Sequence, residues 1–133
     1  MIVADTNLLV YLLVPGARSA QAEAALARDP TWVAPLLWRS EFRNVLVGYV
    51  RRRTLSLDAA LRMVYEAENR MAGREFAVAS GPVLTLATHS GCSAYDSEFV
   101  ALAQDLRIRL VTTDQQVVAA FPSTAVALDE FAG

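Results

Sequence analysis

Short apolar runs alternate with longer amphipathic segments along the whole chain, and no linker or repeat separates them. Five of the runs have the length and composition of buried strands: Met1–Ala4, Trp32–Ala34, Phe76–Ala79, Ile108–Thr112 and Thr124–Leu128. Helices are predicted between them over Asn7–Val14, Ser19–Ala27, about Leu36–Arg53, Ser56–Met71, Ser80 to Gly91, Ser93 to about Leu106, and Gln115–Phe121. Strands that alternate with helices in this way are typical of a parallel sheet covered on both faces. We therefore predict one domain spanning residues 1–133, an α/β fold with three α/β/α layers around a central, mostly parallel sheet.

Local signals set the expected ends and buried faces of these helices. Pro15-Gly16 stops the first helix, Pro35 suits the start of the third, and Ser56 can cap the fourth. Apolar residues at helical spacing predict the buried stripe of the third helix: Trp38, Phe42, Val45, Leu46 and Tyr49. The same helical spacing predicts that Leu57, Leu61 and Val64 of the fourth helix face the core.

The composition predicts more apolar surface than one small core covers. Hydrophobic residues make up 54% of the 133 residues, and the mean hydropathy is +0.30. We expect the third and fourth helices to present apolar positions that a second copy covers, giving a homodimer. The single cysteine, Cys92, excludes an internal disulfide framework and fits a reducing compartment. The apolar segment Leu8–Val14 is far shorter than the roughly 20 residues of a membrane span, and Asp5 argues against a signal peptide. We therefore expect a cytoplasmic protein.

The basic residues carry a weak signal for nucleic acid. The formal net charge is −2, and all 12 basic residues are arginine. Five of them share one segment with Glu41: Arg39, Arg43, Arg51, Arg52 and Arg53. Arginine suits bidentate phosphate contacts, whereas a run such as Arg51–Arg53 also suits a solvated helix end at the negative pole of the dipole. Both interpretations stay open.

Four acids are placed where a parallel sheet gathers side chains. Asp5 and Asp114 each follow a predicted strand, and ligands bind beyond the carboxyl ends of parallel strands. Glu41 lies beside the buried stripe of its helix, where an acid is costly unless it is paired with a cation; a salt bridge to a neighbouring arginine is the alternative. Asp96 lies in the first turn after Ser93, where it could simply compensate the helix dipole. Carboxylates repel one another at close range, so a cluster of four predicts a divalent cation.

Other chemistries find little support in the chain. The only histidine, His89, closes a helix before Gly91, where a cation favours the dipole. A cysteine-protease site is not supported, because the chain has no histidine besides His89 to accompany Cys92. A nucleotide-binding loop is not supported either, because no glycine-rich segment follows the first strand. Glu98 and Asp105 are better explained by helix ends than by a site.

Four motifs resemble those of PIN-domain nucleases, particularly the VapC-type toxins of toxin–antitoxin pairs, and they occur in family order. They are Met1-Ile2-Val3-Ala4-Asp5-Thr6-Asn7, the segment around Glu41 (residues 39–46), Tyr95-Asp96 with the residues to Ala103, and Leu110-Val111-Thr112-Thr113-Asp114. The resemblance implies a PIN-like fold in which Asp5, Glu41, Asp96 and Asp114 hold one or two Mg²⁺ or Mn²⁺ ions. It implies that Asn7 and Thr112 orient Asp5 and Asp114.

The implied activity is that of a metal-dependent endoribonuclease toxin, which cleaves RNA by metal-activated water attack and is inhibited by a cognate antitoxin. The chain departs from the family pattern after Asp114, where Gln115 and Gln116 replace a fifth acid, which argues against a fully occupied second metal site. Phe42 and Phe99 are bulkier than in many relatives, and we interpret them as core residues. The alternatives are a non-catalytic RNA- or protein-binding module on the same fold, and a phosphoacceptor signalling domain. The latter depends on a lysine, and this chain has none.

Overall fold

The computed structural model describes residues 1–133 as five strands and eight helices. The strands are β1 (Ile2–Ala4), β2 (Trp32–Pro35), β3 (Glu75–Phe76), β4 (Leu110–Thr112) and β5 (Ala125–Ala127). The helices are α1 (Thr6–Leu13), α2 (Ser19–Arg28), α3 (Trp38–Arg51), α4 (Leu57–Met71), α5 (Ser80–Ser90), α6 (Ala94–Leu106), α7 (Gln115–Ala120) and α8 (Leu128–Ala132).

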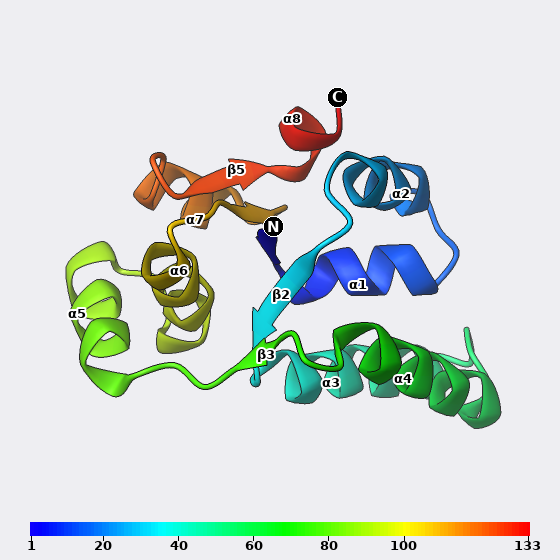
Figure 1. Ribbon diagram of the computed structural model, residues 1–133. Helices are drawn as coiled ribbons and strands as arrows, with labels where there is room; N and C mark the ends of the chain where they lie inside the picture. The colour runs from blue at the N-terminus through cyan, green and yellow to red at the C-terminus, as the bar shows by residue number, and fades with distance from the viewer.

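The strands form one parallel sheet between two helical layers (Figure 1), which confirms the predicted three-layer α/β/α architecture. The strand order is β3-β2-β1-β4-β5, and every neighbouring pair is parallel. Helix α6, backed by α5, packs against β1, β2 and β4. Helices α1 and α4 lie against the other face. Because helices cover both faces, the central strands read as uninterrupted apolar runs.

One cluster of 28 buried residues makes up the core. The central strands contribute all three residues of β1 together with Leu110 and Val111 of β4, and none of these five is more than 3% exposed. Trp38 and Phe42 of α3 pack edge to face with ring centroids 5.7 Å apart, so Phe42 is a core residue as expected. Phe99 is buried too, at 4% exposed.

Several predicted boundaries are wrong. β4 begins at Leu110 instead of Ile108, and β5 begins at Ala125 instead of Thr124. The third strand is Glu75–Phe76 instead of Phe76–Ala79, because only these two residues pair with β2 and Ala79 already stands at the N-cap of α5. Pro35 ends β2 instead of opening a helix, and α3 begins at Trp38. The predicted strand Thr124–Leu128 loses its last residue to the short helix α8, whose buried Leu128 docks on the sheet.

The inward face of α4 also differs from the prediction. Leu57 and Leu61 are 63% and 43% exposed, and Val64 is only partly buried. The residues that α4 buries are Ala60, Ala67 and Met71. Small alanines suit a helix that comes close to its neighbours, so the leucines are left outside. The predicted cap is present, because the Ser56 hydroxyl accepts a hydrogen bond from the Ala59 amide at 3.0 Å. None of the eight helices combines the length and apolarity that crossing a membrane requires.

Candidate active site

The strand order reverses direction between β1 and β4, and the two aspartates stand at this point. From β1 the chain proceeds outward through β2 and β3, whereas β4 and β5 lie on the other side of β1. The register pairs Ala4 with Val111, so Asp5 and Thr112 follow side by side at the carboxyl edge of the sheet. Such a reversal opens a crevice in which open α/β sheets bind ligands.

Thr112 fixes the first of these acids. Its hydroxyl donates a hydrogen bond to Oδ2 of Asp5 at 2.8 Å and accepts one from the backbone amide of Asp114 at 3.0 Å. One buried threonine, 2% exposed, therefore links the ends of β1 and β4. Asn7 lies in the same crevice but hydrogen-bonds neither aspartate.

Glu41 comes from the first turn of α3 and is held by α1. The buried hydroxyl of Thr6 donates a hydrogen bond to Oε1 of Glu41 at 2.7 Å, while Oε2 accepts no hydrogen bond from the protein. The alternative of a salt bridge from Glu41 to an arginine is wrong. No arginine forms an ion pair with Glu41.

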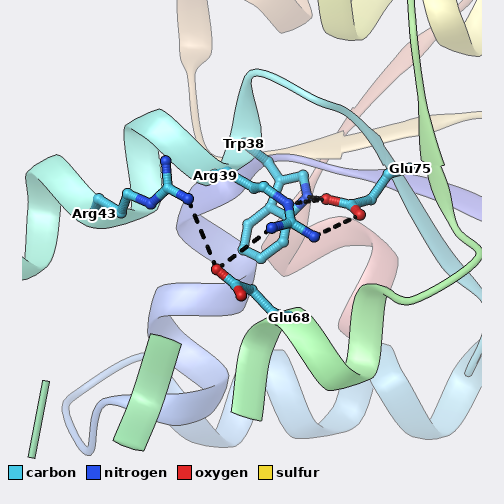
Figure 2. A network of polar contacts seen from close by, with 5 residues as sticks. All are labelled: Trp38, Arg39, Arg43, Glu68 and Glu75. Atoms are coloured by element: carbon cyan, nitrogen blue, oxygen red, sulfur yellow. Dashed lines mark hydrogen bonds and ion pairs between the residues drawn. The ribbon is translucent and has the colours of Figure 1, made fainter. Parts of the chain in front are cut away.

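The neighbouring arginines Arg39 and Arg43 are instead bound by Glu68 and Glu75, as Figure 2 shows. Arg39 donates two hydrogen bonds to Glu75, at 2.5 and 2.9 Å, and Trp38 donates a third from its indole nitrogen at 2.8 Å. Glu68 of α4 lies 3.5 Å from Arg39 and 3.8 Å from Arg43. These two arginines are therefore engaged by carboxylates away from the crevice.

The last two acids stand at helix N-termini. Oδ1 of Asp114 caps α7 by accepting hydrogen bonds from the amides of Gln116 and Val117, at 2.9 and 3.2 Å, and its Oδ2 has no protein donor. Asp96 lies in the first turn of α6. Ser93 caps this helix, because its hydroxyl oxygen accepts a hydrogen bond from the backbone amide of Asp96 at 2.9 Å. Its carboxylate forms no hydrogen bond with the protein.

All four acids line one open pocket of about 440 Å³. Its remaining walls are mainly polar and include no basic side chain: Thr6, Asn7, Asn44, Val45 and Thr113. The structure therefore gathers the four predicted acids in one place. Sequence reasoning missed Thr6, Asn44 and Thr113 as pocket residues, although Thr6 and Thr113 each adjoin a predicted acid.

The electrostatics of the pocket disfavour bare carboxylates. Burial raises the pKa of Asp5, the hydrogen bond from Thr112 opposes this, and the charges of Asp96 and Asp114 raise the pKa further. Burial likewise raises the pKa of Glu41 against the hydrogen bond from Thr6, and Asp5 and Asp96 add to it. The repulsion between these acids is unbalanced by any positive side chain in the pocket.

An all-oxygen pocket of this kind fits a hard divalent cation. Mg²⁺ and Mn²⁺ take carboxylate, carbonyl and water oxygens. At Glu41 and Asp114 the protein anchors one oxygen and leaves the other free, which orients a carboxylate toward a ligand. No group of three or more acidic, histidine or cysteine side chains is arranged in this structure as a metal-ion site. Mg²⁺ usually keeps several waters among its ligands, so the acids of this pocket would have to hold it partly through water.

Fold and pocket together define an α/β/α domain with an acid-lined crevice at the switch point of its sheet. Comparison with known proteins is consistent with this class. The PIN domain family matches residues 2–121. The chain is 30% identical over 125 residues to "Ribonuclease VapC3" of Pyrobaculum aerophilum, covering 92% of this chain and 95% of that protein. The chain belongs to the PIN-domain family, as its motifs predicted.

Solved structures show the same fold at lower identity. The crystal structure of PAE2754 from Pyrobaculum aerophilum superposes with a TM-score of 0.77 at 18% identity, covering 98% of this chain and 85% of that one. A toxin–antitoxin complex from Klebsiella pneumoniae gives a TM-score of 0.71 at 22% identity, covering 96% and 98%. Membership of the PIN-domain family excludes the phosphoacceptor alternative.

Proposed function

We propose that this chain is a metal-dependent endoribonuclease of the VapC type, a toxin held in check by a cognate antitoxin. The observation that carries the proposal is the pocket itself, where four carboxylates meet with no basic side chain among them. The similarity to a protein named as a ribonuclease over nearly the whole chain supports the choice of RNA as substrate. The antitoxin is proposed from the fold shared with a protein solved in a toxin–antitoxin complex.

Each acid has a role that follows from its surroundings. Asp5, Glu41, Asp96 and Asp114 would hold one or two Mg²⁺ or Mn²⁺ ions, directly or through water. A divalent cation held there would supply charge neutralisation, polarisation of the scissile phosphate and activation of water. Thr112 keeps Asp5 in place and Thr6 keeps Glu41 in place, each through one carboxylate oxygen. Oε2 of Glu41 accepts no hydrogen bond from the protein, so it would be available to the ion or to a water molecule that the ion holds.

A metal-free route lacks its residues in this chain. Attack by the RNA's own 2′-hydroxyl needs an acid–base pair near neutral pH. The chain has one histidine and no lysine. His89 lies in the last turn of α5 and does not line the acid pocket.

The chemistry is tested by the ends of the products. Purified protein with Mg²⁺ or Mn²⁺ should cleave single-stranded RNA to 5′-phosphate and 3′-hydroxyl ends, and EDTA should stop the reaction. An RNA with hydrogen in place of the 2′-hydroxyl at the scissile nucleotide should still be cut. Cyclic-phosphate ends would overturn the mechanism. RNA binding without any cleavage would instead support the non-catalytic binding module.

A homodimer is part of the proposal. An apolar groove of about 320 Å³ runs between α3 and α4, and its rim includes the exposed side chains of Val47, Leu57 and Leu61. A second copy would cover these residues, which one core leaves in water.

A further inference from the structure

A second hollow lies at the end of α1 and α3 away from the sheet. It has a volume of about 210 Å³ and is walled by two tyrosines, Tyr11 of α1 and Tyr49 of α3, together with Arg18 and Thr54. The turn at Pro15-Gly16 closes it. Both tyrosine side chains are partly buried, so one part of each packs against the protein and the other part is open to solvent.

The walls of this tyrosine hollow and of the acid pocket come from the same two helices. On α1, Asn7 lines the acid pocket and Tyr11, four residues on, lines the hollow. On α3, Val45 and Tyr49 repeat the same step. Four residues are about one helical turn, a rise of roughly 6 Å.

A polar contact joins one wall residue of each hollow. The hydroxyl groups of Tyr11 and Thr113 lie 3.4 Å apart, and Thr113 is a wall of the acid pocket. Tyr49 follows Glu41 by eight residues of α3, a rise of about 12 Å, so a polymer whose phosphate lies at the acids reaches the tyrosine hollow further along the two helices.

Arginines accompany both rings. The Arg18 guanidinium lies 5.7 Å from the ring centre of Tyr11, and that of Arg52 lies 5.0 Å from the ring centre of Tyr49. Neither arginine forms an ion pair, in contrast to Arg39 and Arg43. Their charges therefore remain available to an anion.

We infer that the tyrosine hollow is a substrate subsite for single-stranded RNA, which takes a nucleotide of the strand that extends from the scissile phosphate along α1 and α3. The base stacks on the tyrosine rings and the guanidinium planes above them, and the phosphate contacts Arg18 or Arg52. Proteins that bind single-stranded RNA combine aromatic stacking with backbone-tracking arginines in this way. The inference rests on the proposed function, because the acids fix where the scissile phosphate lies.

The charge of the hollow favours RNA over a protein segment as occupant. The acid pocket repels phosphate unless a cation fills it, so a bound RNA needs positive charge beside that pocket. The two unpaired arginines, which lie over the tyrosine rings, supply that charge. The groove between α3 and α4 is by contrast lined mainly by aliphatic side chains, as a protein partner prefers.

The test measures binding separately from cleavage. Asp114→Asn serves as the background to suppress cutting, and the probe is a short, fluorescein-labelled, random-sequence single-stranded RNA followed by anisotropy over a salt series. Tyr49→Leu removes a ring and Tyr49→Phe keeps it. Arg52→Gln removes the charge. Tyr65→Leu and Arg62→Gln, at exposed positions of α4, are the matched controls.

Tyr49→Leu should weaken RNA binding roughly tenfold, and Tyr49→Phe should bind like the background protein. Arg52→Gln should lower the slope of log affinity against log salt by about 0.7, one phosphate contact on a single strand. The controls should change neither quantity. Circular dichroism checks the fold. Should Tyr49→Leu fail to fold, the exposed Arg52→Gln change, with its salt slope, decides.

Equal RNA affinity for Tyr49→Leu and Tyr65→Leu, or an unchanged salt slope for Arg52→Gln, would overturn the subsite. The subsite would also be overturned if Tyr49→Leu lost the binding of a protein partner while its RNA binding stayed intact. A wild-type chain that binds RNA through Tyr49 yet never cleaves it would refute the proposed function and leave the subsite standing. If the chain cleaved RNA equally well with Tyr49 replaced by leucine, the subsite would be refuted and the proposed function would stand.

Discussion

Replacing Thr6 with valine removes one hydrogen bond from the acid pocket and changes little else. The side chain is 4% exposed, and its hydroxyl donates to Oε1 of Glu41 at 2.7 Å. Valine has the same shape, so the buried volume is kept while the donor is lost. A hydrogen bond to a charged group contributes about 1.5–3 kcal/mol. Glu41 is only half-buried and water replaces part of the bond, so we expect a loss of about 1.5 kcal/mol, or roughly 5 °C in Tm.

The same change should weaken cation binding. Without Thr6 the carboxylate of Glu41 loses its orientation, and the donor that opposes the rise of its pKa is gone. Groups that orient a metal ligand typically change affinity by about 10- to 100-fold. Thermal unfolding in EDTA measures the first effect, and calorimetric titration with Mn²⁺ measures the second.

Thr6→Ser is the matched control, because it keeps the hydroxyl and removes only a methyl group. It should retain Mn²⁺ affinity close to wild type. Equal Tm in EDTA and equal Mn²⁺ affinity for the valine and serine variants would refute the reasoning, because the hydroxyl would then contribute nothing to Glu41.

Three further outcomes are expected. Glu75→Gln should cost about 1 kcal/mol at neutral pH. The hydrogen bond from Arg39 lowers the pKa of Glu75 in the folded protein. The stabilisation by Glu75 is therefore complete above the pKa of an unfolded glutamate and is lost as the pH falls through the lowered folded pKa. If wild type and Glu75→Gln differed equally in stability at neutral and at acidic pH, this explanation would be contradicted. Asp5→Asn should abolish cleavage, leave the metal-free protein as stable or more stable because repulsion is relieved, and lose the stabilisation that Mn²⁺ gives wild type; a much lower Tm in EDTA would argue for a structural role. Light scattering should show a dimer that Leu61→Glu dissociates, and a wild-type mass of about 14.5 kDa at micromolar concentrations would exclude the dimer.

The sequence predicts the parts of this protein that depend on a short stretch of chain. Apolar runs followed by an acid place Asp5 and Asp114 at strand ends, and parallel strands share the edge at which those ends meet. Ser56 and Ser93 cap helices because their hydroxyls reach amides three residues ahead. Such features need no knowledge of the distant chain.

Features set by partners far along the chain are the ones that sequence reasoning missed. Thr6 meets Glu41 across 35 residues, and Arg39 meets Glu75 across 36. The inward face of α4 was misjudged for the same reason. A rule that turns the largest apolar side chains inward selects Leu57 and Leu61, whereas the close approach of α4 to its neighbours selects Ala60 and Ala67.

The distribution of arginines along α3 follows from the charge of the pocket. Arg39 and Arg43 flank Glu41 by two residues on either side, and a salt bridge from either one would neutralise an acid that we propose holds a cation. Glu68 and Glu75 bind these arginines. Arg52, eleven residues beyond Glu41 at the end of the helix, has no such carboxylate and lies over Tyr49. Glu68 of α4 and Glu75 of β3 thus hold Arg39 and Arg43 away from the acid pocket, whereas Arg52 at the end of α3 keeps an exposed charge where we propose that the RNA backbone lies.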